Sequence, residues 1–377
     1  MSSSSTGTTR TIQLTAVGDL ALYGRVPEAI DRAGADAFCA EGRAALAPGA
    51  LRFANLEVPL VEGAHNTDVM LCGSLSMAHV PRALGLNVVS VANNHIMDAG
   101  PEGLRTTLAA VRAQGVQTVG AGENLAEARR PAVVEEGGAR IGVLAYAEGN
   151  KRLYHHVAGE STPGVAPIDD AAMLADVAAL RPSVDVLVVS LHGGVNYMRF
   201  AMPEQRRVAR LLLEAGADVI LGHHPHVLQG LERLGRGLAA YSLGDFICDG
   251  GVGNVVRPER VEARRDSAVL TVTLAPDAEP AAHWTPFRAD AGFKPCRLDG
   301  AAADAARATL ASYDEFYLEG RYPADPWAEA GKEIGGHALE VLWFHLKRGN
   351  LGYLAKRMFR IRARHLKMLK GVFTRGG

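Results

Sequence analysis

Residues 220–230 read ILGHHPHVLQG, and this stretch decides both the fold and the chemistry that we expect of the chain. An apolar run ends in three histidines, His223, His224 and His226, with Pro225 among them. Histidine is the commonest metal ligand in proteins and the usual proton-transfer side chain near neutral pH. A histidine-rich polar loop would have the same sequence, so the remainder of the chain has to distinguish a loop from a metal site.

Around this stretch, short apolar runs alternate with amphipathic segments over the first two thirds of the chain. The runs that predict buried strands are residues 11–19, 51–60, 87–94, 116–120, 184–194 and 218–224. The segments that predict helices are residues 101–115, 169–179 and 203–216. Residues 228–247 and 267–274 predict antiparallel strands that close a sheet. This alternation is typical of an α/β fold with a partly antiparallel edge.

We predict three parts: a disordered polar tail (1–10), an α/β domain (11–300) and a helical C-terminal appendage (301–377). The net charge of −1 argues against a general nucleic-acid binder, which needs a basic surface. The four cysteines are far apart and form no CxxC pair, which suits a reducing compartment. We see neither a signal peptide nor an apolar run near the roughly 20 residues that span a bilayer. We therefore expect a cytoplasmic protein.

Polar side chains lie at or near the ends of five of the predicted strands. They are Asp19, Glu57, Asn94 with His95, His192, and the histidines of residues 223–226. Ligands of α/β sheets bind outside the carboxyl ends of the strands. One such residue would only indicate a turn, but five strand ends that together offer carboxylate, amide and imidazole groups predict a site for two divalent ions.

Six separated motifs are similar to those of one known family. In chain order they are GDL (18–20), NLEVPL (55–60), ANNHIMDAGPEGL (92–104), LHGGVNY (191–197), GHHPHVLQG (222–230) and YSLGDFI (241–247). The chain resembles the CapA family of poly-γ-glutamate capsule-synthesis proteins, within the calcineurin-like metallophosphoesterase superfamily. The resemblance covers residues 11 to about 275 and implies the calcineurin-like fold, a layered αββα arrangement with mixed sheets.

The resemblance also implies roles for individual residues. The first metal ion would be bound by Asp19 and His226, the second by Asn94, His192 and His224, and Glu57 would bridge the two. Because this set mixes nitrogen and oxygen donors, the ions would be Mn, Fe or Zn. His95 would act as the general acid that protonates the leaving oxygen. Asp98 would orient His95, or it would instead cap the helix that follows. His223 is left for a supporting or packing role.

Two positions depart from the family pattern. The usual Asp-x-His motif reads Asp19-Leu20-Ala21, so the first ion would have an open position or take one ligand from elsewhere. The YSLGDFI motif has Asp245 where we expect asparagine. A carboxylate there would add a ligand, repel an anionic substrate or cap a turn.

Several further residues are candidates for substrate binding. His155 and His156 lie on a long predicted loop, and Asn196, Tyr197 and Arg199 follow His192 closely. An arginine can bind phosphate or carboxylate through two parallel hydrogen bonds. The alternative is that these are solvated surface residues.

The C-terminal stretch predicts a long amphipathic helix with one basic face. Its apolar positions are Leu351, Leu354, Met358, Ile361, His365, Met368 and Val372. Such a helix could contact an anionic membrane surface or an acidic polymer. The simpler interpretation, which we favour, is that its apolar face packs on the α/β domain.

The leading hypothesis is a metal-dependent hydrolase, in which hydroxide held by two ions attacks a phosphoester of small or medium size. The same site would suit a γ-glutamyl amide. The alternative is a non-catalytic or accessory component of a poly-γ-glutamate, capsule or related amide-forming biosynthetic complex. The missing histidine favours this alternative, and the presence of His95 argues against it. A nuclease is the least favoured, because the chain before residue 347 is acidic overall.

Overall fold

The computed structural model of the chain describes residues 11–64, 66, 70–148, 156–250, 262–276 and 278–347, with side chains described up to residue 336. The predicted tail of residues 1–10, His155 and the predicted amphipathic helix of residues 351–372 lie outside the described residues.

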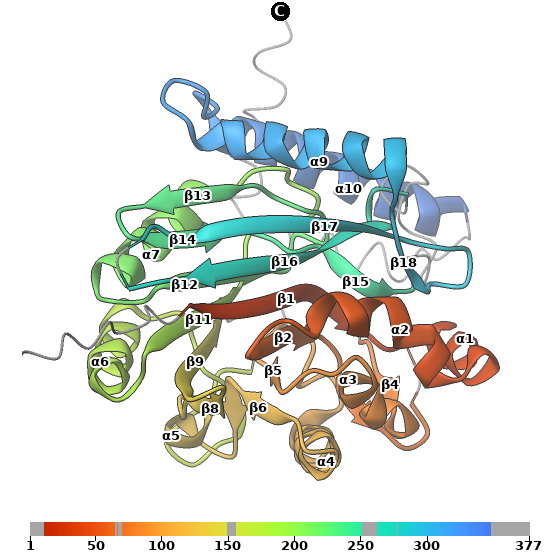
Figure 1. Cartoon of the computed structure of the whole chain (residues 1–377). Coiled ribbons are helices and arrows are strands. Elements are labelled where there is room, and N and C mark those ends of the chain that lie inside the picture. The colour runs from red at the N-terminus through yellow and green to blue at the C-terminus, as the bar shows by residue number, and fades with distance from the viewer. Residues whose placement is uncertain are drawn as a thin grey trace, which may run out of the picture.

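Two mixed β-sheets form the centre of the molecule (Figure 1). Sheet I has the order β18-β17-β16-β1-β2-β5-β6, and β15 also pairs with β1. Its strands are β1 (Ile12–Ala21), β2 (Leu51–Leu56), β5 (Val88–Ser90), β6 (Gln117–Val119), β15 (Asp245–Cys248), β16 (Asp266–Leu274), β17 (Ala281–Ala289) and β18 (Pro295–Arg297). Sheet II has the order β13-β14-β12-β11-β9-β8. Its strands are β8 (Ala132–Glu136), β9 (Ala139–Ala147), β11 (Val186–His192), β12 (Val219–His223), β13 (Leu231–Leu234) and β14 (Gly237–Ala240).

Helices cover the outer faces of the two sheets. The α-helices are α1 (Val26–Ala33), α2 (Ala35–Leu46), α3 (Val80–Ala83), α4 (Gly100–Ala113), α5 (Leu125–Ala128), α6 (Asp170–Leu180), α7 (Pro203–Glu214), α9 (Gly300–Asp314) and α10 (Pro326–Lys347). The short elements are β3 (Leu60–Val61), β4 (Gly73–Ser74), β7 (Ala121–Gly122), β10 (Gly164–Val165) and the 3₁₀ turns η1 (Leu75–His79), η2 (Arg181–Ser183) and η3 (Glu315–Tyr317). The predicted layered αββα arrangement with mixed sheets is confirmed.

The alternation of side chains along β11 shows how the layers are divided. Val186 and Val188 join the cluster that fills the space between the two sheets. Leu187 and Val189 join the second cluster, against helices α6 and α7. Because successive side chains of a strand point to opposite faces, His192 lies on the face of Val186 and Val188, which is directed at sheet I.

Parallel pairing brings the carboxyl ends of the central strands together. In sheet I, β1, β2, β5 and β6 run parallel, and in sheet II β9, β11, β12 and β14 do. The antiparallel edges are β16 to β18 in sheet I and β8 and β13 in sheet II. The antiparallel pairing predicted after residue 228 is present between β13 and β14 and in β16, but β15 pairs in parallel with β1, so the prediction is wrong for residues 245–247.

The C-terminal helices lie across the same end of the molecule as β13 and β17 (Figure 1). Leu310 and Tyr313 of α9 belong to the main hydrophobic cluster, and Ala330 of α10 packs against Met198 and Phe200. Over the described residues, none of the helices combines the length and the apolar character that crossing a bilayer requires.

Candidate metal centre

Asp19 lies at an irregularity of β1 that the sequence around it makes possible. A Cβ atom on Gly18 would lie 1.8 Å from the carbonyl oxygen of Gly244, so only glycine allows β15 to approach β1 here. The Asp19 carboxylate is completely buried. Its Oδ1 accepts a hydrogen bond from Asn55 Nδ2 at 2.8 Å and lies 3.1 Å from His223 Nδ1. Burial and these two contacts fix the orientation of the Asp19 carboxylate, as a metal ligand requires.

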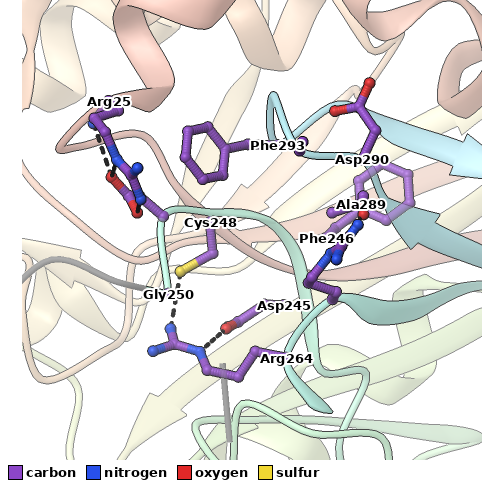
Figure 2. A pocket seen from close by; sticks show the side chains of 12 residues that line it. Arg25, Asp245, Phe246, Cys248, Gly250, Arg264, Ala289, Asp290 and Phe293 are labelled. Atoms are coloured by element: carbon purple, nitrogen blue, oxygen red, sulfur yellow. Dashed lines mark hydrogen bonds and ion pairs between the residues drawn. The ribbon is translucent and has the colours of Figure 1, made fainter. Parts of the chain in front are cut away.

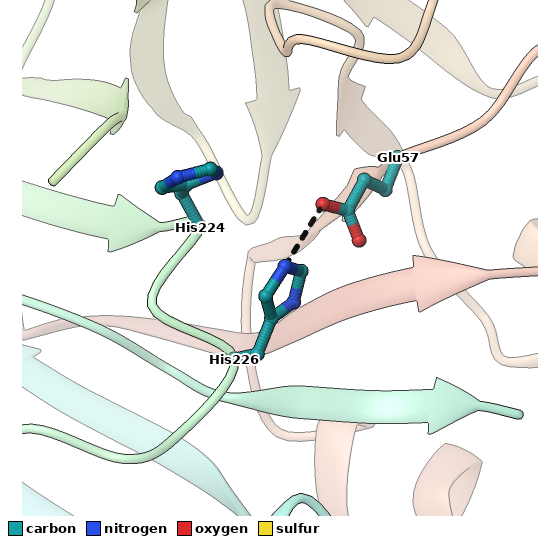
Figure 3. Close-up of side chains that lie close together, drawn as sticks. All are labelled: Glu57, His224 and His226. Carbon is teal, nitrogen blue, oxygen red and sulfur yellow. Dashed lines mark ion pairs between the residues drawn. The ribbon is translucent and has the colours of Figure 1, made fainter. Parts of the chain in front are cut away.

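Glu57 follows β2 directly and supplies the central carboxylate. Its side chain is buried, and Oε1 has no hydrogen-bond partner among the described residues. That oxygen lies 3.7 Å from His226 Nε2 and 4.0 Å from His192 Nε2 (Figure 3). A buried carboxylate oxygen without a hydrogen bond costs free energy, which a bound cation would offset.

The second side of the centre joins a loop of sheet I to a strand of sheet II. His192 ends β11, and its Nε2 lies 2.7 Å from Oδ1 of Asn94, which follows β5. The ring of His224 packs edge-on against the ring of His192, with centroids 5.0 Å apart. Asn94, His192 and His224 are thus brought together, as the sequence predicts.

The turn that follows β12 carries two histidines in the left-handed backbone region. His224 has a φ of 98° and His226 a φ of 60°, a conformation that is costly for residues other than glycine. Figure 3 shows both rings approaching Glu57 from this turn. His223, one residue earlier, points to Asp19 instead. The turn therefore brings His224 and His226 to Glu57, whereas His223 contacts Asp19.

His95 and Asp98 form a hydrogen-bonded pair beside this cluster. Nδ1 of His95 lies 2.7 Å from Oδ2 of Asp98, which also accepts a hydrogen bond from the backbone of Leu71. Asp98 is buried, while the His95 side chain retains 18% of its exposure. The alternative role of Asp98 as a helix cap is wrong, because α4 begins at Gly100 and has no side-chain cap.

Charge and burial shift the proton affinities of the buried groups. Burial raises the pKa of Glu57, and the charge of Asp19 acts in the same direction. Burial and the neighbouring histidines hold the pKa of His192 well below its usual value. Burial alone would lower the pKa of His226, but the carboxylates of Glu57 and Asp245 raise it to about 9. Without a cation, His226 balances part of the carboxylate charge.

The donor atoms suit a pair of divalent ions. One group consists of Glu57, His224 and His226, and a second of Asp19, Glu57, His226 and Asp245, with donor atoms within 4.8 Å of one another in each. Glu57 and His226 belong to both groups, and of the two the Glu57 carboxylate, with two oxygens, suits the bridging position. Together with Asn94 and His192, these residues offer the mixture of oxygen and imidazole donors that Mn, Fe and Zn accept. The residues therefore fit the ions that the sequence predicts.

The predicted substrate-binding residues separate into two groups. Tyr197 lies beside the cluster: its ring centroid is 6.4 Å from that of His226, and its backbone nitrogen donates to the carbonyl of Pro225. Asn196 is half-buried on the same loop. The structure does not join Arg199 or His156 to this group, because Arg199 contacts Tyr313 and His156 is exposed.

The loop that carries Asn196 and Tyr197 is held by the C-terminal region. Ala201 donates its backbone N–H to Tyr317 Oη at 2.9 Å and accepts a hydrogen bond from Tyr322 Oη at 2.6 Å. Phe200 packs against Tyr322, with ring centroids 5.8 Å apart. We call residues 313–322 the aromatic brace. Its contacts explain why Arg199 is turned toward Tyr313.

Sequence reasoning missed three residues that shape the centre. Asn55 and Asn93 are buried amides: Asn93 Nδ2 donates to Asn55 Oδ1, and Asn55 donates in turn to Asp19. The sequence could have indicated both, because Asn55 lies two residues before Glu57 and Asn93 directly precedes Asn94. Arg264 pairs with Asp245 and lies in no motif, so nothing in the sequence indicated it.

Comparison with known proteins agrees with these motifs. The model of the family "Bacterial capsule synthesis protein PGA_cap" matches residues 13–250. The PGA biosynthesis protein CapA of Bacillus subtilis is 34% identical over 173 residues, which is 46% of this chain and 45% of that protein. The capsule biosynthesis protein CapA of Bacillus anthracis is 28% identical over 250 residues, 64% of this chain and 60% of that protein. A probable polyglutamine synthesis accessory protein of Mycobacterium tuberculosis is 34% identical over 208 residues, 52% of this chain and 54% of that protein.

The matches thus span about half of the length of these relatives. Among solved structures, the calcineurin-like phosphoesterase YfkN of Bacillus subtilis is 14% identical, with a TM-score of 0.40 and coverage of 82% of this chain and 98% of that one. The family model covers well over half of the chain, including every residue of the metal centre. The chain belongs to the bacterial capsule synthesis protein (PGA_cap) family.

Proposed function

We propose that the protein is a hydrolase that depends on two divalent metal ions and cleaves a phosphoester or a γ-glutamyl amide. The observation that carries this proposal is the buried Oε1 of Glu57, which has no hydrogen bond among the described residues and lies between His226 and His192. Asp19 and His226 would hold one ion, Asn94, His192 and His224 the other, and Glu57 both. When bound, two such ions activate water as a nucleophile and neutralise the charge that develops on the substrate.

His95 has the geometry of a general acid. Because Nδ1 donates its proton to the Asp98 carboxylate, Nε2 is the nitrogen that faces away from Asp98 and is available to the substrate. In the protonated ring, Nε2–H would pass its proton to the leaving oxygen of an ester or the leaving nitrogen of an amide. Asp98 would stabilise the positive ring and keep its orientation during this transfer.

The substrate class is proposed from two independent arguments. A site of two ions serves the in-line displacement at phosphorus, and it serves the tetrahedral intermediate of amide hydrolysis equally well. The names of the relatives refer to PGA, capsule and polyglutamine synthesis, which favours a γ-glutamyl amide. Tyr197 and Asn196 are the residues that we propose contact the substrate beside the ions.

The experiment that tests the proposal combines metal analysis with turnover. The protein is purified without chelator, its bound metals are counted, and hydrolysis of phosphomonoesters, phosphodiesters and γ-glutamyl amides is measured. We expect about two ions per chain. We expect His95→Ala to lose at least ~10²-fold in turnover and to keep its metal. His226→Ala should lose the metal itself.

A matched control is His283→Ala, because His283 is exposed on β17. It should change neither the metal content nor turnover. If reconstitution leaves the wild-type chain without metal, the hydrolase proposal is wrong.

One observation favours a second function, that of an accessory component in a complex that synthesises an amide-linked polymer. The histidine of the usual Asp-x-His motif is missing, and the position is Ala21. Two bound ions without turnover on any of the three substrate types would support this second function.

A further inference from the structure

Asp245 lies at the edge of the metal centre, and both of its oxygens are engaged. It begins β15 and stands opposite Asp19 in the parallel pairing of β15 with β1. Oδ1 lies 2.9 Å from Nδ1 of His226. Oδ2 accepts a hydrogen bond from Nε of Arg264. The carboxylate is buried, so each of these bonds also replaces lost hydration.

Arg264 is a buried arginine whose guanidinium holds Asp245 from the far side. Only 9% of its side chain is exposed, and Nη2 lies 2.8 Å from Sγ of Cys248 (Figure 2). Both oxygens of a carboxylate are hydrogen-bond acceptors, so Asp245 accepts the proton of His226 Nδ1 on one oxygen and that of Arg264 Nε on the other.

This geometry determines which nitrogen of His226 is available. With Nδ1–H donated to Asp245, the lone pair of the neutral ring is on Nε2. Nε2 is the nitrogen that lies 3.7 Å from Glu57 Oε1, inside the centre. A carboxylate that accepts the second N–H of a metal-binding histidine fixes the ring and increases its basicity.

We propose that Asp245 and Arg264 are a positioning pair that holds His226 with Nε2 directed at the first metal ion. This inference rests on the proposed metal site. It also accounts for Ala21, which stands where the Asp-x-His motif has a histidine. An ion that lacks this ligand is held more firmly if His226 binds it more strongly. Asp245 acts through His226 in this inference, because its Oδ1 contacts His226 Nδ1 and its Oδ2 is held by Arg264.

The test measures binding of Mn²⁺ by calorimetry, with the metal-free full-length chain and its variants. Asp245→Asn should weaken binding by roughly 10- to 100-fold, the usual cost of losing such a partner. Arg264→Met should weaken it by a smaller factor, and Arg264→Lys should restore part of the loss. The double variant should bind about as weakly as Asp245→Asn alone, because the two residues act on one histidine.

The matched control is Arg25→Met. Arg25 lines the same pocket and pairs with buried Asp249 at 2.7 Å (Figure 2). Its loss should leave Mn²⁺ affinity unchanged. Melting of each metal-free variant separates weak binding from failure to fold. In the Zn²⁺-loaded protein, ¹⁵N spectra of histidine should show His226 protonated at Nδ1, and Asp245→Asn should shift that resonance.

The outcomes separate this inference from the proposed function. Wild-type affinity in Asp245→Asn would overturn the positioning role and leave the metal site intact. If Arg264→Met bound Mn²⁺ more tightly and Asp245→Asn as weakly as Asp19→Asn, Asp245 would be a ligand and the inference would be wrong. No Mn²⁺ binding by the wild-type chain would refute the metal site itself, and the positioning role with it.

Discussion

Sheet I and sheet II contribute different chemistry to the same centre. The strand ends of sheet I carry the oxygen donors, Asp19, Glu57 and Asn94. Those of sheet II carry the nitrogen donors, His192, His224 and His226. Neither sheet has a mixed set by itself, so the centre exists only where the two sheets meet.

The two sides are also held differently. The oxygen donors of sheet I are fixed by hydrogen bonds inside the core, as in the chain from Asn93 through Asn55 to Asp19. The imidazoles of sheet II follow strand ends, and the loop beyond His192 is held by the aromatic brace. The comparison predicts that damage to sheet I removes the ions, whereas damage to the brace changes only how substrate is bound.

The largest effect should come from the carboxylate that both ions share. Glu57→Gln keeps the shape and removes the charge, so we expect both ions to be lost. Turnover should fall by more than the roughly 100-fold that loss of a positioning residue costs. Elemental analysis and turnover check this. Glu135→Gln, at an exposed residue of β8, is the control, and two ions per chain in Glu57→Gln would contradict the bridging role.

Asp98→Asn should have the next largest effect, and a different one. It removes the charge that orients His95, so kcat should fall by roughly 10- to 100-fold at unchanged metal content. Loss of metal would show that Asp98 supports the ligands and not the general acid.

Protons and metal ions should compete for His226, one of the imidazole donors of sheet II. The pKa of His226 is raised to about 9 in the metal-free fold, so His226 carries a proton at neutral pH that an ion must displace. Metal affinity should therefore rise about tenfold per pH unit up to about pH 9, with release of about one proton. Calorimetry in buffers of different ionisation enthalpy measures this.

The same shift affects stability in a defined direction. A raised pKa stabilises the metal-free fold below the ordinary histidine value, and this stabilisation is lost as the pH rises toward about 9. The metal-loaded protein should not show that loss. Equal melting profiles of the two forms between pH 6.5 and 9 would contradict the assignment.

The smallest effect should come from the aromatic brace. Tyr322→Phe removes one hydrogen bond to the Ala201 carbonyl, which is worth about 1 kcal/mol. We expect a several-fold increase in KM, little change in kcat and unchanged metal content. Steady-state kinetics beside metal analysis check this. A loss of metal in Tyr322→Phe would mean that the two sides of the centre are not held independently.

The sequence predicted those features that depend on local pattern. Alternation of strands and helices indicated the layered α/β fold, and polar strand ends indicated Asp19, Glu57 and His192. Features that depend on long-range packing were not predictable. Arg264 comes from a segment without a motif, and Arg199 faces Tyr313 because of aromatic contacts that no periodicity encodes.

The order of the metal donors along the chain has a consequence for folding. Asp19 and His226 lie in the first and the fifth of the six motifs, so the centre closes only after strands distant in sequence have paired. Contacts of such long sequence separation form slowly, because the entropy of closing the loop precedes any gain from the contact. The chain must therefore fold with mutually repelling carboxylates before an ion can enter. An ion bound between the two sheets would have to leave before the sheets separate. Bound metal would therefore lower the rate of unfolding.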